Sequence, residues 1–317
     1  MKPLRVGSRG SDLALWQTHH VANEARRAAA QAGEQLQVAV EIITTRGDVD
    51  PAERLVGKLE KGFFTEELEA ALREGRIDFA VHSLKDLPTR MPDGLALGAV
   101  LPRARPVDLL IARPEAVEDH GPAQLPLKRG CRVGASSLRR DSLIRKYGQG
   151  LEPIPFRGNV PTRIQKLRDG KADAILLAAA GVERLALNLE GLVVYDLNQK
   201  RWPGAPGQGA IAAQCRAGDG DVLQTLGRLH HAATAEAVHW ERAFLRVLEG
   251  GCATPFACYV ENGRAWFGQQ KDDRWHSGSV ALPPLPEGPA RDEFITRVLE
   301  GRERIDGDDD SWLFRKK

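Results

Sequence analysis

The chain has 317 residues, of which 42% are hydrophobic and 28% charged, and its formal net charge is only +2. This length allows two or three domains with cores of their own, and the composition is that of an ordinary globular protein. No apolar run reaches membrane-spanning length, and the first ten residues lack the apolar core of a secretory signal. We therefore expect a cytoplasmic protein without a membrane partner.

Positive charge is concentrated in one part of the chain. Between Lys128 and Arg168 the sequence has 11 Lys or Arg residues against two acids. Such a cluster in a nearly neutral protein indicates an anionic ligand. Its only aromatic residues are Tyr147 and Phe156, a poor stacking surface, so we expect no nucleic-acid partner. A solvated helix face accounts for some of these basic residues, but not for all.

The first hundred residues alternate strands and helices, which predicts an α/β domain. A strand over residues 4–8 leads through the loop Arg9-Gly10 into a helix over 11–32 that Ser11 can cap. A strand that enters a helix through a short loop is a ready anion site, and Arg9 and Ser11 lie at it. Further expected elements are strands at 36–45 and 95–101, a helix at 65–74 and a polar, lid-like loop at 46–62.

The stretch AVHSLKDLP, residues 80–88, begins as a buried strand and ends in a Lys-Asp pair before a proline. In α/β folds ligands bind at the carboxyl ends of strands, which is where Ser83, Lys85 and Asp86 lie. The Asp86 carboxylate can exchange protons or stabilise a cation. A solvated turn with a local ion pair is the alternative that this stretch leaves open.

A linker at 102–106 precedes a second set of strands, expected at 108–113, 131–135, 151–156 and 172–178. Ser136 and Ser137 lie at a helix start, just before Arg139 and Arg140. Arginine binds carboxylate or phosphate bidentately, so these two residues, with Arg157 and Arg163, resemble anion clamps. Surface arginines on an amphipathic helix are the alternative for each of them.

An internal echo links the two parts. LREGRIDFAV (72–81) and LRDGKADAIL (167–176) share Leu-Arg-acid-Gly-basic-x-Asp, and VGS at 6–8 resembles VGA at 133–135. We interpret this as two similar α/β domains that face each other across a cleft; because the spacing within each half differs, a chance similarity is the alternative that the sequence leaves open. The chain crosses between them at 102–106 and at 202–209, which would form a hinge, and a strand at 211–216 returns to the first domain.

The last part predicts a small α+β domain. Helices are expected at 221–231, 234–248 and 290–299, strands at 257–261, 264–269 and 276–282, and a frayed acidic tail at 306–310. Cys252 follows two glycines in a loop, where the backbone can approach a ligand closely. The four cysteines are widely spaced without a Cys-x-x-Cys pair, which argues against zinc and, in a reducing cytosol, against disulfides.

Nine motifs run in one order along nearly the whole chain. They are SRGSDLALWQ (8–17), TRGD (45–48), KGFFTEELE (61–69), DFAVHSLKDLP (78–88), VGASSLRR (133–140), RGNVPTR (157–163), DAILLAAAGVERL (173–185), PGQGA (206–210) and LEGGCATP (248–255). Through them the sequence closely resembles the porphobilinogen deaminase family of hydroxymethylbilane synthases. Asp12, Ala135 and the segment 58–60 depart from the family pattern, without removing a matched catalytic residue.

The resemblance implies an α/β fold of two periplasmic-binding-protein-like (type II) lobes facing a cleft, plus a small α+β C-terminal domain. It places domain 1 at 1–101 and 210–228, domain 2 at 106–203 and domain 3 at 232–317. It implies a monomeric transferase with a dipyrromethane cofactor bound to Cys252 by a thioether. Four porphobilinogen molecules would be joined head to tail with loss of ammonia, and the linear tetrapyrrole would then be released by hydrolysis.

The residue roles follow from the same resemblance. Asp86 matches the catalytic aspartate and stands with Lys85, and a carboxylate there can stabilise the azafulvene cation left by ammonia. The cofactor-binding set is Ser83, Lys85, Asp86, Ser136, Ser137, Arg139, Arg140, Arg157, Gly158 and the covalent Cys252. The substrate-binding set is Lys61, Arg9, Ser11, Arg157, Arg163, Arg184 and Gln208, with no metal. The alternative is a non-catalytic two-lobed protein that binds an anionic ligand.

Overall fold

The computed structural model describes residues 3–45, 65–249, 255–307 and 312–317. The chain divides into two compact units. Unit 1 comprises Met1–Ala104 and Ala210–Glu236, and unit 2 comprises Arg105–Gly209 and Ala237–Lys317. The chain passes between the units at the two predicted crossings and a third time, which was not predicted, between Glu236 and Ala237. The division into three domains stays a prediction, and Lys61, Cys252 and the predicted lid-like loop lie outside the described residues.

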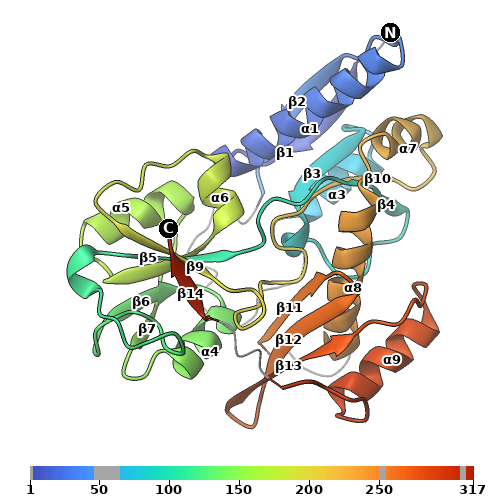
Figure 1. Cartoon of the computed structure of the whole chain (residues 1–317). Coiled ribbons are helices and arrows are strands. Elements are labelled where there is room, and N and C mark those ends of the chain that lie inside the picture. Colours follow the sequence, from blue (N-terminus) through green and yellow to red (C-terminus); the bar gives the residue numbers. More distant parts are fainter. Residues whose placement is uncertain (1–2, 46–64, 250–254, 308–311) are drawn as a thin grey trace. The chain divides into compact units, whose positions relative to one another are not determined.

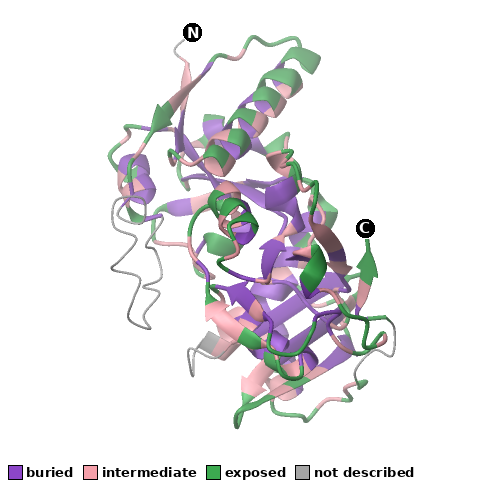
Figure 2. Ribbon diagram, turned by 90° about the vertical axis from the view of Figure 1, so that its left-hand side faces the viewer, coloured by how far each residue is buried: buried purple, intermediate pink, exposed green. Residues whose placement is uncertain are grey.

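Unit 1 is built on a five-stranded sheet (Figure 1). Its strand order is β2 (Val38–Ile42), β1 (Leu4–Ser8), β3 (Phe79–Ser83), β10 (Ile211–Arg216) and β4 (Leu95–Val100). Its helices are α1 (Asp12–Gln31), α3 (Glu66–Arg73), the 3₁₀ turn η2 (Leu84–Asp86) and α7 (Gly220–Gly227). Along α1 buried and exposed residues alternate, because one face packs on the sheet through Val21, Ala25 and Ala29 (Figure 2).

Unit 2 contains a six-stranded sheet of related design. Its strand order is β14 (Phe314–Lys316), β9 (Val193–Leu197), β5 (Asp108–Ala112), β8 (Ala174–Ala178), β6 (Arg132–Ala135) and β7 (Glu152–Pro155). Its helices are η3 (Pro114–Ala116), α4 (Leu138–Tyr147), α5 (Val160–Arg168) and α6 (Ala179–Arg184). Apart from Asp108, strands β5 and β8 are apolar, and both are almost fully buried, as expected for central strands that are covered on both faces.

The two sheets share one topology, which confirms that the chain contains two similar α/β folds. In unit 1 the order β2-β1-β3-β10-β4 matches β7-β6-β8-β5-β9 in unit 2, with β14 as an added edge. In each sheet the first three strands are parallel, and the fourth runs antiparallel to the third. The shared Val-Gly pair, at 6–7 and 133–134, also has a physical cause, because both glycines are closely packed. A Cβ on Gly7 would lie 2.4 Å from Ile77, and one on Gly134 would lie 2.6 Å from Phe156.

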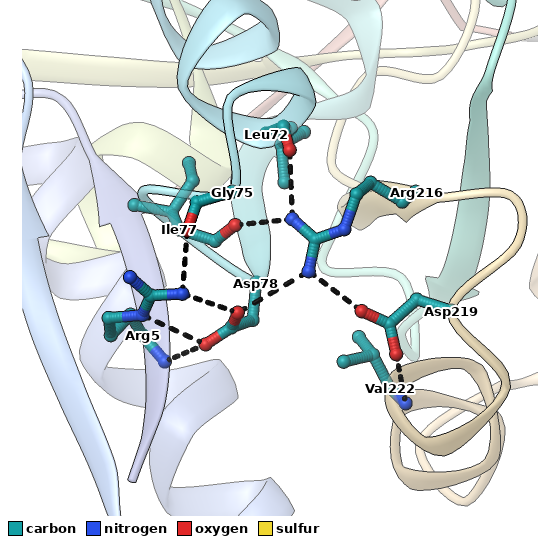
Figure 3. Close-up of polar contacts among 8 residues, drawn as sticks. All are labelled: Arg5, Leu72, Gly75, Ile77, Asp78, Arg216, Asp219 and Val222. Atoms are coloured by element: carbon teal, nitrogen blue, oxygen red, sulfur yellow. Dashed lines mark hydrogen bonds and ion pairs between the residues drawn. The ribbon is translucent and has the colours of Figure 1, made fainter. Parts of the chain in front are cut away.

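An arginine–aspartate clasp fixes the central parallel pair of unit 1. Asp78, just before β3, accepts hydrogen bonds from the backbone N–H of Arg5 at 2.7 Å and from its guanidinium at 2.9 Å (Figure 3). The same guanidinium donates to the carbonyl of Gly75 at 2.8 Å. Arg216 of β10 joins the clasp by donating to Asp78 at 3.4 Å and to Asp219 at 2.7 Å.

Unit 2 repeats this clasp with equivalent residues. Asp173, just before β8, accepts from the backbone N–H of Arg132 at 2.8 Å and from its Nε at 3.2 Å. Arg132 also donates to the carbonyl of Gly170 at 3.0 Å. The shared Leu-Arg-acid-Gly-basic-x-Asp motif therefore encodes the glycine carbonyl and the aspartate that hold an arginine on the neighbouring strand.

The rest of unit 2 is a three-stranded antiparallel sheet covered by helices (Figure 1). It comprises β11 (Phe256–Glu261), β12 (Arg264–Lys271) and β13 (Arg274–Ala281), with α8 (Ala232–Glu249), which begins in unit 1, and α9 (Pro289–Leu299). Phe244, Phe267 and Ile295 belong to its apolar core. This confirms the predicted α+β character of the last part.

Several local expectations can be compared with the structure. Ser11 caps α1, accepting from the backbone N–H of Ala14, as predicted. The expectation of a frayed end is wrong at Asp306, whose backbone pairs with Ser279 of β13. Strand β14 was not predicted from the sequence. It pairs with the edge of β9, and the residue just before it, Leu313, is fully buried. Residues 308–310 lie outside the described part. No helix in the described ranges is long and apolar enough to cross a membrane.

The clasp predicts an acid dependence of stability. Burial alone raises the pKa of Asp78, but hydrogen bonds from Arg5 and Arg216 outweigh it and lower the pKa below the usual value. This stabilisation is complete above the unfolded-state pKa and is lost as the pH falls through the folded-state value. We expect Asp78→Asn to reduce the free energy of unfolding by about 1–2 kcal/mol at neutral pH.

Urea unfolding between pH 7 and pH 3 would measure this effect. The difference between wild type and Asp78→Asn should be constant above about pH 5 and should narrow below about pH 4. Asp93→Asn, at an exposed position of the same unit, is the control. A difference that stays constant down to pH 3 would contradict the assignment.

Candidate functional site

A small cavity of about 80 Å³ opens at the carboxyl ends of β1 and β3 in unit 1. Four of the predicted site residues lie in its wall: Arg9, Ser11, Ser83 and Asp86. Arg9 and Ser11 follow β1, whereas Ser83 ends β3 and Asp86 ends the following 3₁₀ turn. The parallel pairing of β1 and β3 brings these two loops to one sheet edge.

Hydrogen bonds from α1 fix the polar wall of this cavity. Gln17 is 3% exposed and donates through Nε2 to the hydroxyl of Ser83 at 2.8 Å. Thr18 donates to the hydroxyl of Ser8 at 2.8 Å, which ties α1 to the end of β1. Ordered partners of this kind hold a binding group in one orientation before a ligand arrives.

His82 adds a neutral polar group to the cavity wall. The pKa of His82 is lowered to about 4, chiefly by burial; a hydrogen bond with Gln214 opposes this shift, and the nearby Arg9 charge adds to it. Its buried Nε2 has no hydrogen-bond partner among the described residues. His82 is therefore uncharged near neutral pH, and among the described lining residues the positive charge comes from Arg9.

Asp86 and Lys85 are exposed at the end of η2. The backbone N–H of Leu84 donates to the carbonyl of Ala210 at 3.0 Å, and that of Leu87 donates to Leu84 at 3.2 Å. This turn presents Asp86 to the cavity and to solvent, where a carboxylate can meet a cationic group. The structure thus brings Asp86 beside the Arg9 loop.

Arg139 and Arg140 lie in unit 2 around a buried carboxylate. Their residues are 5% and 7% exposed, so the alternative of surface arginines is wrong for these two. Asp108, at the start of β5, accepts from Arg139 at 2.8 Å and from Arg140 at 2.7 Å. Burial alone raises the pKa of Asp108, but the two guanidinium groups outweigh it and lower the pKa far below its usual range.

The other predicted arginines of unit 2 are less buried. Arg163 donates through Nε to the carbonyl of Gly158 at 2.7 Å, and Arg184 donates to the carbonyl of Gly209 at 2.8 Å. Burial lowers the pKa of Arg184 to about 10, so it remains a cation at neutral pH. Gly158 has a φ of +124°, and a Cβ there would meet Thr162 at 2.9 Å. Ser136 donates its hydroxyl proton to the carbonyl of Phe156.

The structure thus gathers the predicted residues into groups within each unit. Arg9, Ser11, Ser83 and Asp86 share a cavity in unit 1, whereas Arg139, Arg140 and Gln208 share Asp108 in unit 2. That both groups line one cleft stays a prediction. Sequence reasoning missed Gln17, Asp108 and Trp202. The signal for Asp108 is an acidic residue at the start of an otherwise apolar strand.

Comparison with known families identifies both parts of the chain. Residues 4–224 match the model of "Porphobilinogen deaminase, dipyromethane cofactor binding domain". Residues 235–265 match the model of "Porphobilinogen deaminase, C-terminal domain". The first match alone covers more than half of the chain and includes both groups of site residues.

Similar proteins carry the same name. The chain is 43% identical over 258 residues to the porphobilinogen deaminase of Synechococcus elongatus, covering 80% of this chain and 77% of that protein. It is 44% identical over 261 residues to that of Gloeobacter violaceus, covering 81% of this chain and 76% of that protein.

Solved structures with a similar fold include an arginine-specific periplasmic binding protein of Salmonella typhimurium. It has a TM-score of 0.40 and 11% identity, with 74% of this chain and 94% of that chain covered. Because the family models match most of the sequence and two relatives exceed 40% identity, the chain belongs to the porphobilinogen deaminase family.

Proposed function

We propose that this member of the porphobilinogen deaminase family joins four porphobilinogen molecules head to tail, with loss of one ammonia at each addition, and releases the linear tetrapyrrole by hydrolysis. Membership of the family supports a transferase of the hydroxymethylbilane synthase type. The single observation that carries the proposal is the cavity in which Asp86 lies with Arg9, Ser11 and Ser83. It combines a carboxylate for a developing cation with groups that bind carboxylates.

Asp86 has the central chemical role. When the substrate loses ammonia, the C–N bond breaks, the electron pair leaves with nitrogen, and positive charge develops on the pyrrole and its methylene carbon. An exposed carboxylate at the cavity edge stabilises that charge electrostatically. The same group can accept and return the proton of a pyrrole N–H. Lys85, adjacent on η2, adds a positive charge beside this carboxylate.

The polar groups around the site bind the acetate and propionate side chains of the substrate. In unit 1, Arg9 supplies the charge, and the hydroxyls of Ser11 and Ser83 supply hydrogen bonds at the cavity wall. The remaining proposed substrate-binding residues are Lys61, Arg157, Arg163, Arg184 and Gln208. Arginines suit this task because their planar guanidinium donates two parallel hydrogen bonds to one carboxylate.

The residues of unit 2 fit a cofactor that carries carboxylates. The Nε of Arg139 is buried and has no hydrogen-bond partner in the described part of the chain, and its cluster there has two guanidinium groups but one carboxylate. The proposed dipyrromethane cofactor would be held by a thioether to Cys252 and by Ser83, Lys85, Asp86, Ser136, Ser137, Arg139, Arg140, Arg157 and Gly158. When bound, the dipyrromethane supplies the pyrrole end to which the first substrate is joined.

We further propose that the protein is a cytoplasmic monomer that acts on a small molecule, without nucleic-acid or membrane partners. The near-neutral net charge of +2 and the scarcity of aromatics in its basic segment support this view. The alternative of a non-catalytic binding protein has only fold similarity in its favour, and it gives no role to Asp86.

The first test is Asp86→Asn. The amide keeps the shape of the side chain but has no charge to stabilise the substrate cation, so we expect turnover to fall by about 10²–10³-fold. Thermal unfolding should be unchanged, because Asp86 is exposed. Ammonia release and tetrapyrrole formation measure turnover, and Asp93→Asn is the matched control. A fully active Asp86→Asn variant would refute the catalytic role.

The second test addresses the covalent cofactor. The intact mass of the purified wild type should exceed that of the sequence by two linked pyrrole units, whereas Cys252→Ser should have its bare mass. Cys258→Ser, at a buried cysteine of β11, is the control and should retain the added mass. If the wild type has a bare mass that porphobilinogen does not increase, the proposed function is wrong. An added mass on Cys252→Ser would move the attachment elsewhere.

A further inference from the structure

Because the two sheets share one topology, equivalent positions in the two units can be compared residue by residue. Strand β10 in unit 1 and β5 in unit 2 hold the same place in the sheet order. Ile211 of β10 lies opposite Ser83, and Asp108 of β5 lies opposite Ala178. Ser83 and Ala178 end equivalent strands, so Asp108 takes the place that Ile211 has in unit 1.

Helices α1 and α4, which follow equivalent strands, also differ in this way: apolar residues in unit 1 correspond to charged residues in unit 2. Ser11 and Ser137 are the N-cap residues of α1 and α4. Counted from these caps, Arg139 and Arg140 of α4 correspond to Leu13 and Ala14 of α1. One copy of the fold therefore has apolar residues where the other has one carboxylate and two guanidinium groups.

The fold itself does not require this charge cluster. Ile211 is 2% exposed within the apolar core of unit 1 and fills its position by packing alone. Apolar residues commonly stabilise a protein as well as a buried ion cluster does, because burial removes the hydration of every charge. The buried charges of unit 2 are thus better explained by function than by folding.

Asp108 is bound tightly from several directions. Its side chain is fully buried. Oδ2 accepts from Arg139 at 2.8 Å, from Arg140 at 3.2 Å and from the indole of Trp202 at 3.0 Å. Oδ1 accepts from Arg140 at 2.7 Å and from Gln208 at 3.0 Å. Five hydrogen bonds use all the accepting capacity of the carboxylate, so Asp108 has none left for a ligand.

The two arginines retain capacity that Asp108 does not use. Two positive charges face one negative charge, so the cluster has a net charge of +1. The Nε of Arg139 is buried and makes no hydrogen bond within the described residues. A buried charge of this kind favours an anion that can complete the cluster.

The same cluster holds the chain crossings of unit 2. Gln208 donates from its Nε2 to the carbonyl of Pro106 at 2.9 Å as well as to Asp108. Arg139 donates to the carbonyl of Pro203 at 2.8 Å. The orientation of the arginines is thereby fixed against both segments, and any shift of one guanidinium would disturb several bonds.

We propose that Asp108 is a positioning residue for the cofactor: it holds Arg139 and Arg140 in one orientation and leaves one excess positive charge for a cofactor carboxylate. This inference rests on the proposed function, since it takes the dipyrromethane as the ligand of these arginines. Asp108 acts through the arginines and does not itself touch the ligand.

The test is a thermodynamic cycle that uses cofactor loading. The melting temperature of loaded wild type is compared with that of Cys252→Ser, which gives the stabilisation by the cofactor. The same pair is measured in the Asp108→Asn background. We call the gap the difference in melting temperature between the loaded protein and its Cys252→Ser variant. If Asp108 is merely structural, Asp108→Asn should lower both melting temperatures equally and leave the gap unchanged. If Asp108 is a positioning residue, the gap should shrink by about half or more.

Asp173→Asn is the matched control. Asp173 also holds an arginine of unit 2, but Arg132 is outside the proposed cofactor set. We expect this variant to lower both melting temperatures without changing the gap. An unchanged gap in Asp108→Asn, or an equal reduction in Asp173→Asn, would overturn the proposal. If loading itself fails in the wild type, the proposed function fails, and that outcome is visible by mass before any cycle.

Two further results remain decisive if Asp108→Asn behaves poorly. The first is that Asp108→Asn carries no added mass, while the double variant with Cys252→Ser still unfolds cooperatively. This result supports the proposal, because it means that the cofactor no longer stabilises the Asp108→Asn protein at all. If Asp108→Asn does not fold, Trp202→Phe replaces it, because this change removes one donor to Oδ2 and keeps all three charges. A reduced gap in Trp202→Phe supports the positioning role, and a wild-type gap overturns it.

Discussion

The architecture depends on one interaction that occurs twice. An arginine near the start of one strand binds an aspartate just before its parallel neighbour, as Arg5 with Asp78 and as Arg132 with Asp173. The bond fixes the register of the central parallel pair, and a slip of one residue would turn every side chain to the opposite face. The loops at the carboxyl ends, which supply Arg9 and Asp86, thus have their positions set at the other end of the strands.

On this common framework the two units place a carboxylate in opposite environments. Asp86 is exposed on a 3₁₀ turn, so that a substrate can approach it. Asp108 is buried and saturated by donors, so that only other side chains reach it. This difference in burial suits the two roles proposed above: a charge that interacts with a changing ligand would stay at the surface, and a charge that orients arginines would be enclosed.

Much of this framework could be predicted from the sequence, because it is written in local patterns. The strands at Leu4–Ser8 and Ile211–Arg216 and the Ser11 cap follow from apolar runs and helix-start chemistry. The echo of the Leu-Arg-acid-Gly motif predicted a duplicated fold, because that motif carries the clasp. The grouping of Arg9 with Asp86 follows from strand ends that meet at one sheet edge.

Other features depend on contacts between distant residues, for which the sequence has no local signal. Asp108 meets Arg139 and Trp202 across 31 and 94 residues of sequence. The basic segment indicated an anionic ligand. It could not show that one anionic partner of its arginines is a residue of the chain itself, Asp108. Similarly, the Phe-Arg-Lys strand β14 lacks an apolar pattern and forms because the edge of β9 is open to it.

A single turn joins the arginine cluster to α8, the helix that precedes Cys252 in the sequence. Glu241 of α8 is fully buried and accepts from the backbone N–H of Gly207 at 2.7 Å and of Val260 at 2.9 Å. Gln208, the next residue of the turn, donates to Asp108. Gly207 and Gly209 have φ values of +79° and +86°, which only glycine adopts readily. Two buried carboxylates therefore hold consecutive residues of one turn, so the arginines and α8 share an anchor that fixes both to the same short segment.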